Sequence, residues 1–187
     1  MHKLWQKKLE LHYSKVVIDI VQFGSTTKEG ENPNDIDIAV LFKSIPLKQQ
    51  LEEAQLIKKQ LEKESNLPIH INAFTMESLF DESNFAKENI IISGMSLLLQ
   101  KPFSYRLGLL PRIQVGYSLR GLEKKDKIRC NYLLNGKGGK YGLLREYKGL
   151  LIKPGLIEIP PSVENIFVEA LKKITPALKI RKILVPL

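Results

Sequence analysis

The most informative stretch of this sequence is VVIDIVQFGSTTKEGENPNDID, residues 16–37. Its first eight residues are rich in β-branched side chains and predict a buried strand that ends at Gly24. The nine residues between Ser25 and Asp35 include glycine, proline and asparagine, which are typical of a turn or loop. The stretch therefore predicts a strand, a glycine turn, a loop and the start of a second strand.

Two carboxylates, Asp35 and Asp37, begin this second strand. Because side chains alternate between the two faces of a strand, both carboxylates point one way, and Ile36 and Ile38 point the other. Two carboxylates this close repel each other unless a cation lies between them. Hard oxygen ligands of this kind suit Mg²⁺ that also binds substrate phosphates. The pattern predicts a site for a nucleoside triphosphate with its divalent ion.

These residues resemble the nucleotidyltransferase superfamily related to DNA polymerase beta, and within it the small stand-alone minimal nucleotidyltransferases. The resemblance covers roughly residues 10–100 and rests on Gly24-Ser25, the spacer and Asp35-Ile36-Asp37. It implies an α+β fold in which a mixed sheet is flanked by helices. It also implies that Gly24 and Ser25 contact nucleotide phosphates, and that Asp35 and Asp37 hold divalent metal ions.

A third acidic residue of the family pattern is replaced in this chain. Family members carry a further Asp on the neighbouring strand, and here His70 occupies the expected position within residues 67–74, after a predicted amphipathic helix at 47–63. A neutral imidazole supplies no negative charge and prefers softer metals than Mg²⁺. Three outcomes stay open: weakened Mg²⁺ catalysis, Mn²⁺-assisted catalysis with His70 as ligand or base, or nucleotide binding without chemistry. The other carboxylates that could complete the site are Asp19, Glu77 and Asp81.

The leading hypothesis is a metal-dependent nucleotidyltransferase that uses Mg²⁺ or Mn²⁺. It would transfer a nucleoside monophosphate from an NTP to a nucleic-acid or protein acceptor, with Asp35, Asp37 and His70 as catalytic residues. The alternative is a catalytically impaired protein of the same fold that binds nucleotide or nucleic acid. A third possibility, which the resemblance implies, is an antitoxin-type minimal nucleotidyltransferase that modifies or neutralises a protein partner.

Charge is unevenly distributed along the 187 residues, whose net charge is +9. Residues 1–102 hold 12 Lys, no Arg and 14 acidic residues, whereas residues 103–187 hold 17 basic and 6 acidic residues. The guanidinium group of arginine can donate two parallel hydrogen bonds to a phosphate. The basic region therefore indicates a nucleic-acid partner more than a merely solvated basic surface. The shift in composition predicts a nucleotidyltransferase-like domain at 1–102 and a small basic α+β domain at 103–187.

The C-terminal region shows the pattern of a folded α+β domain. A strand is predicted at 113–119 and a helix at 122–134. The apolar runs 150–152 and 156–159 flank a Lys-Pro-Gly turn and predict a hairpin. Ser162 follows two prolines and is the predicted N-cap of a further helix.

A glycine-rich segment at 136–142 follows the predicted basic helix. Successive backbone amides in such a turn can cradle an anion, and two lysines accompany them. Together with the basic residues of the helix, the segment predicts contact with a nucleic-acid backbone, against an ordinary flexible turn as the alternative. The residues predicted to make the contact are Lys124, Lys125, Arg129, Lys137 and Lys140.

Composition argues against several other classes of protein. With Cys130 as the single cysteine, an intrachain disulfide is impossible, and a reducing compartment is expected. The longest charge-free apolar run, 89–100, is too short to span a bilayer, and the N-terminus shows no signal-peptide pattern. The three histidines show no zinc-site spacing. We therefore expect a cytoplasmic protein without a membrane segment.

Overall fold

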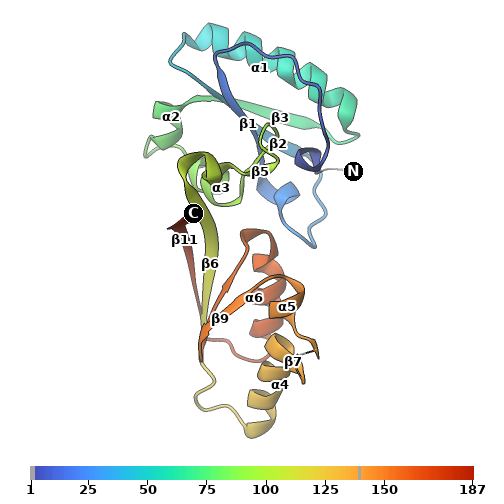
Figure 1. Ribbon diagram of the computed structural model, residues 1–187, viewed down its shortest axis with the longest axis vertical. Coiled ribbons are helices and arrows are strands. Elements are labelled where there is room, and N and C mark those ends of the chain that lie inside the picture. Colours follow the sequence, from blue (N-terminus) through green and yellow to red (C-terminus); the bar gives the residue numbers. More distant parts are fainter. Residues whose placement is uncertain (1–2, 139) are drawn as a thin grey trace. The chain divides into compact units, whose positions relative to one another are not determined.

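This protein combines helices with a mixed β-sheet and is an α+β structure. The computed structural model describes residues 3–138 and 140–187, which form two units (Figure 1). Of these residues, unit 1 contains those up to Thr27, those from Glu31 to Leu110, and Leu187. Unit 2 contains Lys28–Gly30 and Pro111–Pro186. The composition of the chain changes earlier, at residue 102, but the next residue, Phe103, is still part of the core of unit 1.

Unit 1 is built on a five-stranded sheet with the strand order β3-β2-β1-β4-β5. Its elements are η1 (Leu4–Gln6), β1 (Val17–Phe23), η2 (Gly24–Thr27), β2 (Ile36–Phe42), α1 (Leu47–Leu61), η3 (Glu62–Glu64), β3 (Ile69–Thr75), α2 (Met76–Phe80), α3 (Lys87–Ser93), β4 (Met95–Ser96), β5 (Lys101–Pro102) and η4 (Phe103–Leu107). Strand β2 pairs antiparallel with β1 and parallel with β3. The parallel connection passes through α1, as parallel pairs require a crossover.

Strand β2 carries apolar side chains to both faces of this sheet. Ile36 and Ile38 are fully buried in a cluster that includes Ile57 of α1, whereas Leu41 joins Ile90 of α3 in a second cluster. Figure 1 shows α1 on one side of these strands and α3 on the other. Full burial of an aliphatic side chain contributes about 1.5–3 kcal/mol, so two covered faces fix the central strands firmly. The ends of these strands are therefore rigid supports for a site.

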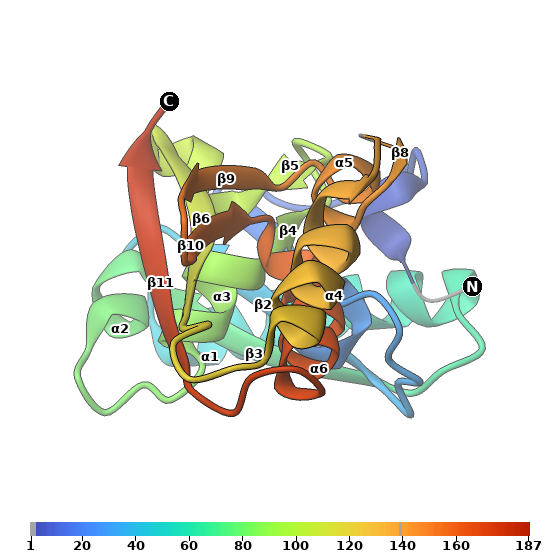
Figure 2. The ribbon, with the colours of Figure 1, turned by 90° about the horizontal axis from the view of Figure 1, so that it is seen from below.

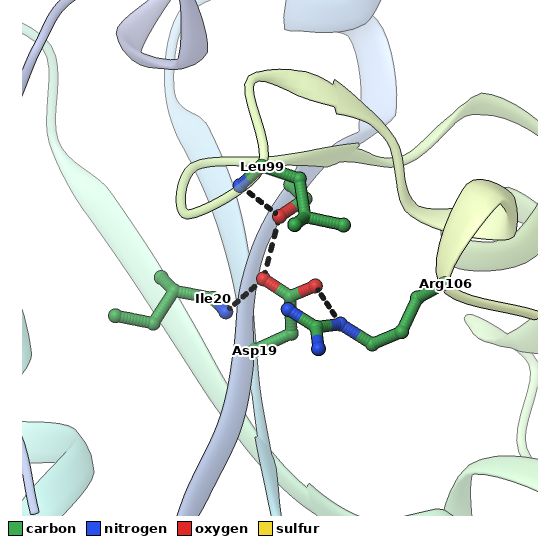
Figure 3. Close-up of polar contacts among 5 residues, drawn as sticks. Asp19, Ile20, Leu99 and Arg106 are labelled. Atoms are coloured by element: carbon green, nitrogen blue, oxygen red, sulfur yellow. Dashed lines mark hydrogen bonds and ion pairs between the residues drawn. The ribbon is translucent and has the colours of Figure 1, made fainter.

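A buried carboxylate connects β1 with the segment that follows β4. Asp19 is 0% exposed and accepts hydrogen bonds from Arg106 Nε at 2.7 Å, from Ser96 Oγ at 2.7 Å and from the Ile20 backbone N–H at 2.8 Å (Figure 3). Ser96 Oγ in turn accepts a hydrogen bond from the Leu99 N–H at 2.9 Å. Both oxygens of Asp19 are thus paired, as a buried charge requires.

Unit 2 contains a four-stranded sheet with the order β11-β6-β10-β9, and a two-stranded sheet of β7 and β8. Its elements are β6 (Leu109–Tyr117), α4 (Lys124–Asn135), β7 (Gly136–Lys137), β8 (Lys140–Tyr141), α5 (Leu143–Glu146), β9 (Leu150–Lys153), β10 (Leu156–Ile159), η5 (Pro161–Val163), α6 (Glu164–Lys172) and β11 (Leu178–Pro186). Figure 2 shows α4 and α6 on the same side of the larger sheet. Among the described helices of the chain, none combines the length and the apolar character needed to cross a bilayer.

Two local predictions in unit 2 have different outcomes. The hairpin predicted for 150–152 and 156–159 is confirmed, because β9 and β10 pair antiparallel. The prediction that Ser162 is the N-cap of the next helix is wrong. Pro161 starts the 3-10 helix η5 with its fixed φ, so Ser162 already lies inside a helical turn. Helix α6 begins two residues later, and its N-cap residue, Val163, makes no side-chain cap.

Candidate functional site

The ends of three neighbouring strands bring the principal candidate residues together. In the register of the sheet, Asp37 pairs with Phe23 on one side and with His70 on the other. Gly24 follows Phe23 at the end of β1, and Asp35 directly precedes β2. The backbone pairing therefore places a glycine turn, two carboxylates and an imidazole at one end of β1, β2 and β3.

Gly24 has a backbone conformation and a position that favour glycine. Its φ is +79°, and a Cβ built at this position would lie 2.4 Å from Asp37 Oδ2. The carboxylate of Asp37 thus occupies the space that a side chain would need. The turn is held by Thr26 and Thr27, whose hydroxyls each donate to the carbonyl three residues earlier, at 3.1 and 2.8 Å. Ser25 lies half-buried within this short 3-10 helix, η2.

His70 contacts both carboxylates at the strand ends. Its Nδ1 lies 3.3 Å from Asp35 Oδ2 and 4.0 Å from Asp37 Oδ1. The two carboxylates are about two-thirds buried, whereas the imidazole is mostly exposed. Burial raises the pKa of Asp37, the negative charge of Asp35 raises it further, and His70 lowers it. The imidazole therefore lies where it offsets part of the repulsion between the two carboxylates.

The other carboxylates considered for this site lie elsewhere in unit 1. Asp19 pairs with a β2 residue four positions beyond Asp37, which is about 13 Å along the strand, and its oxygens are already bound. Glu77 and Asp81 follow β3, at the end of the strand opposite to His70. In the part of the chain that the structure describes, no group of three or more His, Cys, Asp or Glu side chains is arranged to hold a metal ion. Asp35, Asp37 and His70 lie together at the strand ends, but by themselves they therefore do not form a complete metal site.

Replacing Asp37 with Asn tests this electrostatic balance in the free protein. At neutral pH we expect a small gain in the free energy of unfolding, below about 1 kcal/mol because solvent screens the site. A raised pKa means that the folded wild-type protein takes up a proton more readily than its unfolded chain. Relative to the variant, the wild-type protein therefore gains stability as pH falls, and the advantage of the variant should disappear. Urea unfolding between about pH 7 and pH 4 measures the difference.

Asp81 provides a control of opposite sign for this experiment. Hydrogen bonds from Ser83 lower the pKa of Asp81, which is fully exposed. The Asp81→Ala variant should therefore be less stable than the wild-type protein at neutral pH, and this deficit should shrink in acid. A loss of stability at neutral pH in Asp37→Asn would contradict the proposed repulsion.

Two of the predicted nucleic-acid contacts lie on the small hairpin of unit 2. Lys137 and Lys140 are cross-strand partners in the β7–β8 pair. Beside them Tyr141 is 93% exposed, and with Lys140 and Arg145 it lines a hollow of about 650 Å³. An exposed aromatic ring with neighbouring cations can stack on a base while the cations contact phosphates. The acidic Glu146 lines the same hollow, so its charge is mixed.

The other three predicted contacts lie on α4 and are not equivalent. Lys125 and Arg129 line a groove between α4 and α6, whose other lining residues are mostly apolar. Lys124 is exposed but does not line this groove. Of the three basic residues, two therefore border the groove and one is exposed to solvent outside it.

Sequence reasoning missed a cationic hollow on the larger sheet of unit 2. Lys153, Lys179 and Arg181 line a space of about 270 Å³ together with Gln114, and none of its lining residues is acidic. These residues come from three strands that are distant in sequence, so no local motif contains them. The available signal was the spacing of Lys179 and Arg181, which places both on one face of a strand.

The structure thus gathers Gly24, Asp35, Asp37 and His70 at one end of a sheet, with Ser25 in the adjoining turn. It distributes the basic candidates over a hairpin and a helix of unit 2. Function has to be inferred from these residues, because comparisons with protein-family models, curated proteins and solved structures find no match to this chain.

Proposed function

We propose that unit 1 binds a nucleoside triphosphate with a divalent ion and transfers a nucleoside monophosphate to an acceptor. The observation that best supports this proposal is the close approach of the Gly24 backbone to Asp37, whose Oδ2 would lie 2.4 Å from a Cβ at Gly24. A backbone without a side chain beside a carboxylate lets one ligand approach both peptide N–H groups and the carboxylate. A triphosphate carrying a cation is a ligand of this kind.

The two carboxylates suit Mg²⁺ as a bound ion. If the imidazole of His70 also binds, the ligands suit Mn²⁺ better than Mg²⁺. Asp35 and Asp37 offer the oxygen ligands that both ions take, and His70 adds a nitrogen ligand that suits Mn²⁺. When bound, the ion would neutralise triphosphate charge and help to orient the α-phosphate. Ser25 and the amides of its turn would contact the terminal phosphates.

The transfer itself needs positioning and one proton acceptor. The acceptor oxygen would bond to the α-phosphorus, the bond to the bridging oxygen would break, and pyrophosphate would leave with the electron pair. The acceptor's proton would pass to Nε2 of His70, because Nδ1 faces Asp35 at 3.3 Å. His70 would then serve as the general base when Nε2 does not bind the ion, because one nitrogen cannot do both.

A second function, nucleotide binding without turnover, is favoured by one specific observation. The residue beside the two carboxylates is an imidazole, which supplies no negative charge when neutral. Two carboxylates alone would hold a catalytic ion weakly. A protein of this kind would recognise a nucleotide and use the binding for another purpose.

Transfer from labelled NTPs separates the two functions. With RNA, DNA and protein acceptors we expect faster transfer in Mn²⁺ than in Mg²⁺, and His70→Asp should raise the rate in Mg²⁺. Asp35→Asn should lower transfer at least about a hundredfold, because the ion's contribution to the transition state is several kcal/mol. Asp81→Asn, at the other end of β3, is the matched control and should leave the rate unchanged.

Two results would contradict the proposed transfer activity. If neither ion supports transfer and His70→Asp introduces it, the natural chain is a binding protein. If the chain binds no NTP in either ion, both functions fail. Nucleotide affinity, measured by equilibrium dialysis, is therefore determined before transfer is assayed.

The acceptor we propose is a nucleic acid. The net charge of +11 over residues 103–187 supports it, as does the hairpin that places Lys137 and Lys140 beside the exposed Tyr141. A protein acceptor is the alternative, and the acceptors of the transfer assay distinguish them.

A further inference from the structure

A groove of about 600 Å³ lies between α4 and α6 in unit 2. On the α4 side, Ile128 and Tyr132 line it at helical i, i+4 spacing and are 42% and 48% exposed. On the other side, Ala170 of α6 and Ile174, which lies in the turn after this helix, line the groove. Apolar side chains of both segments therefore border one open surface.

Helix α4 is apolar on two of its sides. Cys130 and Leu134 are each 1% exposed and form the inner side of the helix, while Ile128 and Tyr132 form the side toward the groove. A helix that meets only water on its outer surface carries polar residues there. Exposed apolar patches with a polar rim mark interaction sites in soluble proteins.

The rim of the groove is positively charged. Lys125 and Arg129 lie on the α4 side, and Lys173 lies on the α6 side. No lining residue of the groove is acidic. The surface therefore combines an apolar floor with cations on both borders.

The floor and the length of the groove decide between two classes of macromolecule. A nucleic-acid backbone is polar and anionic, so it gains from the cations but leaves the apolar floor uncovered. From Lys125 to Tyr132 the groove follows α4 for two turns, or about 11 Å. A third helix with an apolar stripe covers such a floor, and acidic residues beside its stripe meet the cations.

We propose that the groove between α4 and α6 binds an amphipathic helix of a partner protein, with Asp and Glu residues on both borders of its apolar stripe. Lys125 and Arg129 then pair with acidic side chains, and Ile128 and Tyr132 supply the apolar contact. The assignment rests on unit 2 alone and does not depend on the nucleotide site proposed for unit 1.

Fluorescence anisotropy with a synthetic helical peptide tests this proposal on the full chain. The probe is a labelled peptide of about 14 residues with Leu at i, i+3, i+4 and i+7 and Glu on both sides of the stripe. A peptide of the same composition, with its Leu residues spread around the helix, is the negative probe. A labelled single-stranded RNA is the competing ligand class.

Two variants and a matched control locate the binding. Ile128→Ser/Tyr132→Ser and Lys125→Glu/Arg129→Glu should each weaken binding of the amphipathic peptide at least about tenfold, because they remove central contacts. Lys127→Glu/Lys172→Glu makes the same change of charge on α4 and α6, at exposed residues outside the groove, and should change affinity less than about threefold. Circular dichroism melting checks that all variants are folded, which their exposed positions favour.

Each outcome supports or overturns the proposal. Selective binding of the amphipathic peptide, lost in the first two variants, supports it. Equal affinity for the two peptides, or unchanged affinity in Ile128→Ser/Tyr132→Ser, overturns it. RNA binding that is lost in this variant, with no peptide binding to the wild-type protein, assigns the groove to nucleic acid instead.

Discussion

Replacing Gly24 with Ala is expected to lower the proposed nucleotide transfer about a hundredfold with only a moderate loss of stability. The new Cβ would lie 2.4 Å from Asp37 Oδ2, so the carboxylate has to move. A carboxylate at the end of a flexible side chain moves at little cost to the fold, but a displacement of about 1 Å can lower a reaction rate about a hundredfold. Transfer rate and divalent-ion-dependent nucleotide affinity are the quantities to measure.

Gly30 provides the matched control for this variant. Its φ of +77° is almost the same as the +79° of Gly24, but a Cβ at Gly30 would meet nothing within 4 Å. Both alanine variants should lose about 1–2 kcal/mol of unfolding free energy, because both force alanine into the left-handed region. Only Gly24→Ala should lower nucleotide transfer. Equal activity in the two variants would show that the contact with Asp37 has no functional role.

Arg106→Met should be among the most destabilising substitutions in unit 1, at about 3–5 kcal/mol. Arg106 Nε donates to Asp19 at 2.7 Å, and Asp19 is 0% exposed, so the variant leaves a buried carboxylate without its cation. Asp19→Asn should cost less, about 1–2 kcal/mol, because the amide keeps a hydrogen-bond acceptor for Ser96 and Ile20. Urea unfolding gives both free energies.

The double variant identifies the cause of this loss. If the unpaired charge is responsible, Asp19→Asn/Arg106→Met should be more stable than Arg106→Met alone. Lys58→Met is the control, because it breaks an exposed pair with Glu62 at 3.8 Å and should cost less than about 0.5 kcal/mol. A similar cost for Lys58→Met and Arg106→Met would refute a special role of the buried pair.

Local patterns in the sequence predicted most elements near the strand ends. The β-branched run before Gly24 corresponds to β1, and the amphipathic stretch at 47–63 corresponds to α1 and η3. Both patterns depend on neighbours in the chain, because period two and period 3.6 are read over a few residues. The alternation that separates Asp37 from Ile36 and Ile38 is of the same kind.

Contacts between segments that are distant in the sequence could not be predicted from local sequence patterns. Asp19 was an unusual charged residue in an apolar run, but its partner Arg106 lies 87 residues further along the chain. The groove beside α4 was missed because its sequence reads as a basic helix. Only the burial of Cys130 and Leu134 shows that Ile128 and Tyr132 form a separate, outer apolar stripe.

The pairing of Asp19 with Arg106 also has a consequence for the order of folding during translation. Asp19 enters β1 early, but its cation is synthesised 87 residues later, which takes roughly 4–17 s at usual rates of protein synthesis. Burial of β1 during this interval would lack the ion pair, at a cost of about 3–5 kcal/mol. We therefore expect the stable packing of β1 to follow the synthesis of the segment with Arg106.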